Sequence, residues 1–184
     1  MKIKYVNGAD IRNTTDTDFA GFSTSNYSPL VPKGAVWMEQ YLKPEKDLML
    51  HIIETEKKFR QFKDARTFLE KEARKRGPCP PFAKKRERRS GRTLVWVDGA
   101  TVRKFLDPYF FLGGHDLVYS YIPKNEIWID ALNYSNDQQF TIIHELKERV
   151  LMARGMEYHS AHDYALAEER HYRRKAGVAR FENG

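Results

Sequence analysis

The fold is decided by the stretch Thr93-Leu-Val-Trp-Val-Asp-Gly-Ala-Thr-Val-Arg103, because an earlier stretch matches it in order and residue type: Lys2-Ile-Lys-Tyr-Val-Asn-Gly-Ala-Asp-Ile-Arg12. The same offset of 91 positions lays residues 2–58 on residues 93–149 without a gap and with 11 identities. Similarity at one fixed offset is typical of a duplicated structural unit. We therefore predict an α+β fold built from two tandem, pseudo-symmetric repeats.

Each repeat is predicted to begin with a β-hairpin. A strand-like stretch at 3–6 precedes Asn7-Gly8, and apolar residues at 94–97 precede Asp98-Gly99. Asn-Gly and Asp-Gly readily adopt the positive φ angles of a two-residue hairpin turn. A further strand pair is predicted at 117–122 and 126–130, separated by a turn at Pro123. Each repeat should therefore contain a small antiparallel sheet.

Two packed helices are expected to follow the sheet in each repeat. In the second repeat, Asn136 or Asp137 can cap a helix whose one apolar stripe holds Phe140, Ile143, Leu146 and Val150. The predicted helices cover residues 44–62, 64–76, 136–155 and 160–175. The predicted boundaries are a first repeat at 1–73, a basic linker at 74–92, a second repeat at 93–176 and a tail at 177–184.

The positive charge of the chain is concentrated in the predicted linker. The net charge is +7, and residues 74–92 hold nine basic residues and one acidic residue. The rest of the chain is close to neutral, with 23 basic and 24 acidic residues. The linker is therefore a candidate contact for nucleic acid. A single cysteine, Cys79, and the lack of a long apolar run favour a cytoplasmic protein without a membrane partner. The sequence sets no oligomeric state.

A candidate metal site lies on the last two predicted helices. His144 and Glu148 are four residues apart, so their side chains leave a helix about 40° apart and can bind one cation. His162 on the following helix supplies a third ligand. Glu145 can reach a water on that cation, and Glu169 is either a fourth ligand or a hydrogen-bond acceptor for one. Two histidines, one carboxylate and an open position are typical of catalytic zinc.

At these residues the chain resembles the zincin metallopeptidases, and in particular their gluzincin branch. That family carries H-E-x-x-H on one helix and a glutamate ligand on the next. Here His144-Glu145-Leu-Lys-Glu148 is followed by His162, so one histidine and the glutamate ligand are exchanged between the helices. The resemblance covers about residues 115–170 and implies a zinc-dependent hydrolase that acts on a peptide or protein.

The resemblance also implies roles for neighbouring residues. Glu145 would be the catalytic base. The predicted strand 126–130 would be an edge strand that pairs with an extended substrate. His115 is a candidate for binding substrate or metal, and Tyr158 and Tyr164 are candidates for donating a hydrogen bond to an oxyanion.

Other interpretations of these residues remain open. Glu145 and Arg149 can form an ordinary i, i+4 ion pair. The first repeat has Ile53 and Lys57 where the second has His144 and Glu148, which indicates a degenerate copy without metal ligands. An alternative function is a non-catalytic module that binds nucleic acid or protein through the basic linker.

Overall fold

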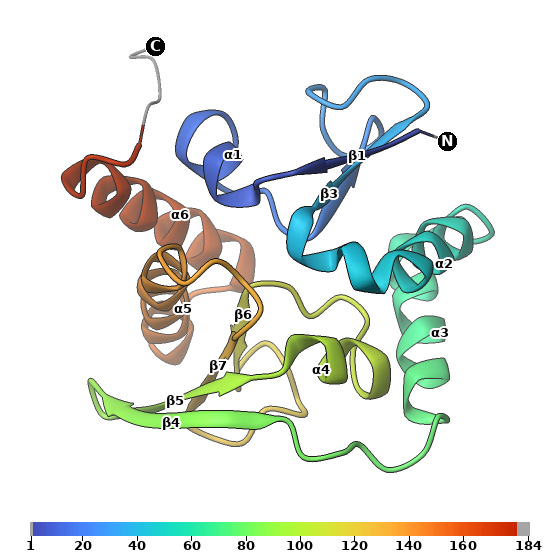
Figure 1. The fold of residues 1–184 in the computed structure, drawn as a ribbon. Coiled ribbons are helices and arrows are strands. Elements are labelled where there is room, and N and C mark those ends of the chain that lie inside the picture. The colour runs from blue at the N-terminus through green and yellow to red at the C-terminus, as the bar shows by residue number, and fades with distance from the viewer. Residues whose placement is uncertain (1, 180–184) are drawn as a thin grey trace.

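The computed structural model describes residues 2–179, which form an α+β fold with two small mixed sheets and six α-helices (Figure 1). The first sheet has the order β1 (Lys2–Val6), β3 (Ala35–Glu39), β2 (Phe22–Thr24). The second has the order β4 (Ala83–Arg89), β5 (Arg92–Val97), β7 (Glu126–Asp130), β6 (Gly113–His115). The helices are α1 (Gly8–Thr14), α2 (Lys46–Glu56), α3 (Phe62–Arg74), α4 (Gly99–Phe105), α5 (Gln138–Ala153) and α6 (Tyr158–Lys175), with a 3₁₀ helix η1 (Gln40–Glu45). Most of the predicted tail lies outside the described residues.

The predicted hairpin turns at Asn7-Gly8 and Asp98-Gly99 are wrong, because both pairs begin helices. The Asn7 side chain accepts the backbone N–H groups of Ala9 and Asp10, and Asp98 accepts that of Thr101. Asparagine and aspartate are favoured as helix N-caps as well as in tight turns. The local sequence therefore allows two outcomes, and packing selects the helix.

These helices also make the prediction of purely antiparallel sheets wrong. After β1 the chain passes through α1 and β2 before it returns as β3, so β3 runs parallel to β1. The second sheet repeats this arrangement, with β7 parallel to β5 and β6 antiparallel to β7. The register is the same in both, since Lys2 pairs with Ala35 and Thr93 pairs with Glu126, each 91 residues further along.

The predicted strand at 117–122 is absent, since this segment forms turns. The His115 carbonyl accepts the N–H groups of Val118 and Tyr119, which closes a turn directly after β6. Tyr119 and Tyr121 pack against the core that contains Trp128. The strand that pairs with β7 is instead β6, so β7 lies inside the sheet and cannot be the predicted substrate-binding edge.

The predicted linker at 74–92 is partly a strand. Residues 83–89 form β4, which pairs antiparallel with β5 through a tight turn at Ser90 and Gly91, both of positive φ. Every residue of β4 is exposed, because only one edge of the strand is covered and neither face is packed. The basic segment therefore forms the outer edge of the second sheet.

The helices lie close to their predicted positions. α5 begins directly after the predicted cap Asp137, and α6 begins two residues before Ser160. α2 is shorter than predicted and ends at Glu56. No helix among residues 2–179 is long and apolar enough to span a membrane.

A buried arginine holds the first sheet to the rest of the molecule. Arg12 donates to the Phe19 carbonyl at 2.7 Å and to Glu39 at 2.9 Å, both within the first half of the chain. It also donates to Asp137, the residue before α5, at 2.9 Å. Its side chain is only 1% exposed, so these carboxylates must balance its charge.

Arg103, 91 residues after Arg12, has the equivalent contacts in the second sheet. It donates to the Phe110 carbonyl at 2.9 Å and to Asp130 at 2.5 Å. It also donates to Glu45, the residue before α2, at 2.8 Å. Each half therefore supplies a carboxylate at the start of a helix to the arginine of the other half.

Candidate metal centre

The candidate centre is built on the helical hairpin of α5 and α6. The chain leaves α5 at Gly155, whose φ of +94° few other residues adopt, and Glu157 caps α6 by accepting two backbone N–H groups. Ala161 and Ala165 on α6 are fully buried, so the two helices can pack closely. Across this contact His144 and Glu148 on α5 lie close to His162 on α6.

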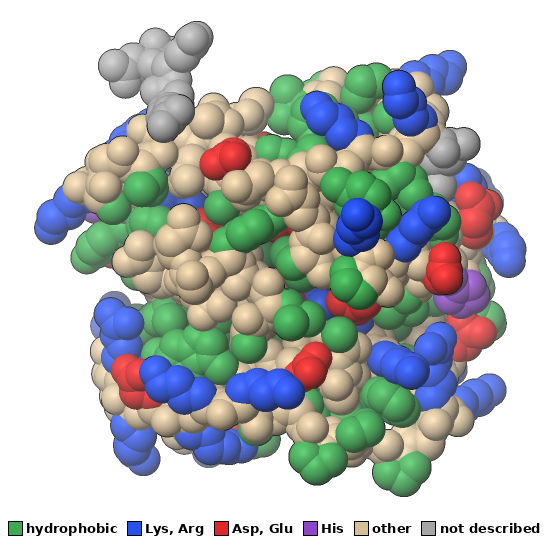
Figure 2. All heavy atoms as spheres, in the orientation of Figure 1, with side chains coloured by type: hydrophobic (Ala, Val, Ile, Leu, Met, Phe, Trp, Pro, Cys, Tyr) green, Lys and Arg blue, Asp and Glu red, His purple; other side chains and the backbone are tan. Residues whose placement is uncertain are grey.

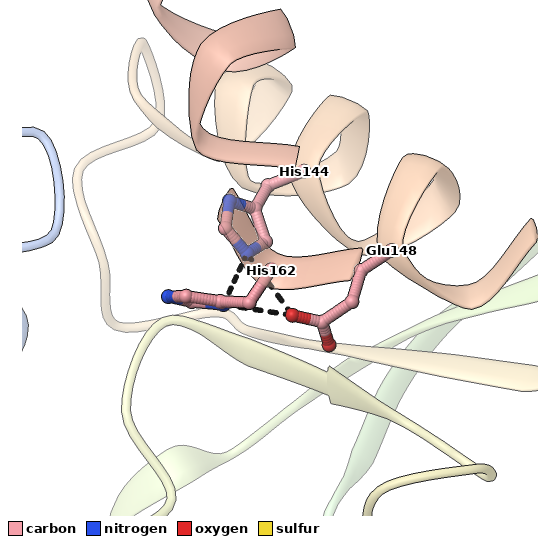
Figure 3. Close-up of side chains that lie close together, drawn as sticks. All are labelled: His144, Glu148 and His162. Carbon is pink, nitrogen blue, oxygen red and sulfur yellow. Dashed lines mark hydrogen bonds and ion pairs between the residues drawn. The ribbon is translucent and has the colours of Figure 1, made fainter. Parts of the chain in front are cut away.

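Three ligand atoms of these side chains converge on one point (Figure 3). His144 Nε2 lies 3.2 Å from His162 Nδ1, and His162 Nδ1 lies 2.7 Å from Glu148 Oε2. His144 Nε2 lies 3.6 Å from Glu148 Oε2. Ligands at zinc distances of about 2.0–2.2 Å in a tetrahedron stand roughly 3.3 Å apart. The three atoms therefore fit one face of a zinc tetrahedron, and all three residues line the same cleft.

Glu169 lies beside this set rather than in it. Its Oε2 is 3.0 Å from His144 Nδ1, the ring nitrogen that does not face the other two ligands. A carboxylate at this nitrogen holds the proton on Nδ1 and leaves Nε2 free for a metal. The sequence predicts Glu169 to be either a fourth ligand or a hydrogen-bond acceptor for a ligand, and its position favours the second role.

His115 holds the Glu148 carboxylate. It is fully buried, which excludes the predicted contact with substrate. Its Nδ1 accepts the backbone N–H of Leu117 at 3.2 Å, so the ring proton lies on Nε2, which donates to Glu148 Oε1 at 3.0 Å. His115, Glu145 and Glu148 also lie close enough to hold a cation. That arrangement would leave the Leu117 N–H without its acceptor, so His115 is better placed to orient Glu148.

Glu145 borders the ligand set without an ion-pair partner on its own helix. Burial raises its pKa to about 7; the positive charge of His144 opposes this rise, and the negative charge of Glu148 adds to it. The predicted i, i+4 pair with Arg149 does not form, because both oxygens of Asp116 accept from Arg149, at 2.5 and 2.8 Å. A carboxylate whose pKa lies near neutrality is suited to accept a proton.

The charges in the ligand set are arranged to attract a cation. Burial lowers the pKa of His144, but hydrogen bonds to Glu148 and Glu169 outweigh burial and raise it to about 10. Hydrogen bonds to Asp18 and Glu148 raise the pKa of His162 to about 9. Burial alone would raise the pKa of Glu148, but hydrogen bonds from the surrounding histidines hold it well below its usual range. Without a metal, protons supply the positive charge that these carboxylates need.

The cleft beside the ligand set holds about 120 Å³ of open space. This is room for a few water molecules or a small part of a ligand. Tyr158 lines the cleft and stacks on His162, with ring centroids 5.6 Å apart. Burial and the nearby carboxylates Glu148 and Glu145 raise the pKa of Tyr158 to about 12, so it remains a hydrogen-bond donor at neutral pH.

Tyr164 does not belong to this site. It is 58% exposed on α6 and does not line the cleft. Tyr119, which the sequence analysis did not select, does line it. Thr17 and Asp18 from the first half also line the cleft, and no local pattern in the sequence identifies them.

The first half has no ligands at the equivalent positions. Lys57 pairs with Glu54 at 2.7 Å on the surface of α2. Arg66, which aligns with His162 when five residues are omitted at the turn between the helices, donates to Asp107 at 2.8 Å and to Glu70 at 3.0 Å. The two groups of metal-ligating side chains found among residues 2–179 both lie in the second half.

Comparisons of the chain with protein-family models, with curated proteins and with solved structures found no match.

Proposed function

We propose that the chain is a zinc-dependent hydrolase, with a peptide or protein as its substrate. The observation that carries this proposal is the convergence of His144 Nε2, His162 Nδ1 and Glu148 Oε2, with Glu145 beside them. All four residues line the same cleft. The donor set, two imidazoles and one carboxylate, is one that zinc uses in catalytic sites.

Each residue of the site has a distinct part in this proposal. Zinc bound here would acidify a water molecule and polarise the carbonyl under attack. Glu145, with its raised pKa, accepts the proton of the water and delivers it to the leaving group. Tyr158 and Tyr119 line the cleft as hydrogen-bond donors for the oxygen on which negative charge develops.

A peptide is the proposed substrate because the pattern of His144, Glu145, Glu148 and His162 resembles that of the zincin metallopeptidases. β6 is the last strand of the second sheet, and its first residue, Gly113, lines the cleft. All three residues of β6 are buried, so the strand positions α5 and is not proposed as a binding edge. A Cβ on Gly113 would press on Thr141 of α5, so glycine lets the strand approach the helix that carries the ligands.

The test is the zinc content of protein purified without chelator. The wild type should hold about one zinc per chain, and His144→Ala and His162→Ala should lose it. His171→Ala, which removes an exposed histidine elsewhere on α6, is the control and should keep it. Glu145→Gln should retain zinc but lose at least 100-fold in the hydrolysis of a mixed peptide library. A wild type that takes up no zinc when it is offered would exclude this function.

We also propose that the two halves arose by duplication of one β-α-β-β-α-α unit. The matching register of the two sheets and the equivalent contacts of Arg12 and Arg103 support this origin. An experimental structure in which residues 2–58 do not superpose on 93–149 would contradict it.

A second candidate function is nucleic-acid binding by the β4–β5 hairpin. Figure 2 shows Lys and Arg side chains along the lower edge of the molecule, where β4 lies in Figure 1. At the tip, Arg89 lies directly opposite Arg92, and Arg88 adjoins them. Like charges opposite one another destabilise a strand pair, and phosphate groups would relieve that repulsion.

A further inference from the structure

A loop of the first half reaches the proposed metal centre. It connects α1 to β2 and lies against α6, where Thr17 Oγ1 accepts from Arg170 Nε at 3.2 Å. The next residue, Asp18, places Oδ1 3.2 Å from His162 Nε2. Asp18 is 63% exposed, so little burial holds it there. Its contact with the imidazole is therefore a specific feature of the loop.

The contact matches the chemistry of a metal-binding histidine. His162 faces Glu148 and His144 with Nδ1, so its remaining ring proton lies on Nε2, which points to Asp18. A carboxylate at that nitrogen fixes the tautomer and the ring orientation and makes the imidazole a stronger ligand. Asp18 thus does for His162 what Glu169 does for His144.

Glu169 is itself held in place from the first half. Arg173 Nε donates to Glu169 Oε1 at 2.8 Å, and Arg173 also donates to Asp137 at 2.7 Å. Asp137 in turn accepts from Arg12 at 2.9 Å. All four side chains are buried. A continuous set of charged hydrogen bonds therefore runs from the first sheet to His144.

We infer that the first half of the chain completes the metal centre, with Asp18 as a positioning residue for His162 and Arg12 as an anchor for the residues that orient His144. This inference rests on the proposed zinc site. It gives the first half a part in the site although that half holds no ligands of its own.

The contacts in the opposite direction support a reciprocal arrangement of the two halves. Tyr109, 91 residues after Asp18, donates to Glu56 on α2 at 2.8 Å. Arg103, the counterpart of Arg12, donates to Glu45 before α2. Each half thus reaches the helices of the other, as two subunits do across a two-fold axis. Only one of the two reciprocal contacts meets a set of metal ligands.

The test is the affinity for Zn²⁺, measured by competition with a chelating indicator. Asp18→Ala should weaken zinc binding about 10–100-fold, the range found when such partners of ligands are removed. Asp18→Asn keeps a hydrogen-bond acceptor and should lose less. The control is Asp10→Ala, an exposed acid on α1 that should bind zinc as the wild type does. Above about pH 9, where His162 has lost its proton, the zinc-free variant should melt at or near the temperature of the zinc-free wild type, because Asp18 is exposed.

The visible spectrum of the Co²⁺-substituted protein gives a second measurement. The wild type should show tetrahedral absorption, and Asp18→Ala should shift or weaken it as His162 loses its orientation. Wild-type affinity and an unchanged spectrum in Asp18→Ala would overturn the inference while leaving the zinc site intact. A wild type that binds no zinc would instead remove the proposed function, and this inference with it.

Discussion

His144, His162 and Glu148 lie so close together that their charges must be balanced locally. The raised pKa values of the two histidines mean that they hold protons in the metal-free protein at neutral pH. A zinc ion would take the place of those protons, because only the deprotonated imidazole binds metal. Proton binding and metal binding therefore compete at the same nitrogen atoms.

This competition predicts how stability changes with pH. The folded-state pKa of His144 lies above its usual value, so protonation stabilises the zinc-free fold below about pH 6.5, and that stabilisation is lost as the pH rises toward about 10. In the presence of a chelator, we expect the melting temperature to fall by several degrees between pH 7 and 9.5, since each kcal/mol lost lowers it by roughly 2–4 °C.

The control for the pH experiment is His144→Gln, whose melting temperature should depend less on pH over this range. Zinc affinity of the wild type should change in the opposite direction and increase with pH. A melting temperature that is constant from pH 7 to 9.5 would show that the histidines are not protonated in the zinc-free fold.

At the scale of elements, a glycine at the start of a helix lets each sheet bury an ion pair. A Cβ on Gly99 would overlap the Asp130 carboxylate, and a Cβ on Gly8 would overlap that of Glu39. Neither glycine has a positive φ, so glycine is needed at these positions because a carboxylate approaches the backbone closely. The Asn-Gly and Asp-Gly pairs therefore serve to cap a helix and to admit a carboxylate.

Replacing Gly99 should disrupt the second sheet. In Gly99→Ala the methyl group displaces Asp130 from Arg103, which is fully buried. We expect a loss of about 3 kcal/mol in the free energy of unfolding, the lower end of the cost of an unpaired buried charge. Asp98→Ala, which removes the cap of the same helix and a partly exposed ion pair with Lys84, should cost about 1 kcal/mol. Urea denaturation measures both, and equal losses would contradict this explanation of the glycine.

At the scale of the whole molecule, the two halves form one structure with two separate candidate surfaces. Reciprocal carboxylates bind each half to the buried arginine of the other. The cleft lies beside α5 and α6, and the basic hairpin forms the far edge of the second sheet. Hydrolysis and nucleic-acid binding can therefore be tested independently.

If the β4–β5 hairpin binds nucleic acid, the affinity should depend on salt concentration. A triple variant Arg88→Gln, Arg89→Gln, Arg92→Gln should bind duplex DNA more weakly, and the slope of log affinity against log salt should fall by up to about 0.9 for each lost phosphate contact. The control is Lys33→Gln, Lys43→Gln, Lys46→Gln, which removes the same charge from exposed positions of the first half. Equal slopes in the two variants, by fluorescence anisotropy, would mean that the hairpin has no special part. Binding of an acidic peptide but not of DNA would also contradict the proposal.

The sequence by itself determined the offset of 91 residues, the helices α5 and α6, and the candidate ligands His144, Glu148 and His162. The two helices and the pairing of His144 with Glu148 follow from local properties, because helical periodicity and i, i+4 spacing depend only on neighbours along the chain. Tertiary structure decided whether Asn7-Gly8 and Asp98-Gly99 turn the chain or begin a helix, because a buried carboxylate from a distant strand requires the glycine. It also brought Asp18 to His162 and His115 to Glu148. The first contact joins residues that are 144 positions apart in the sequence, and the second joins residues that are 33 positions apart. Only packing of the whole chain creates them.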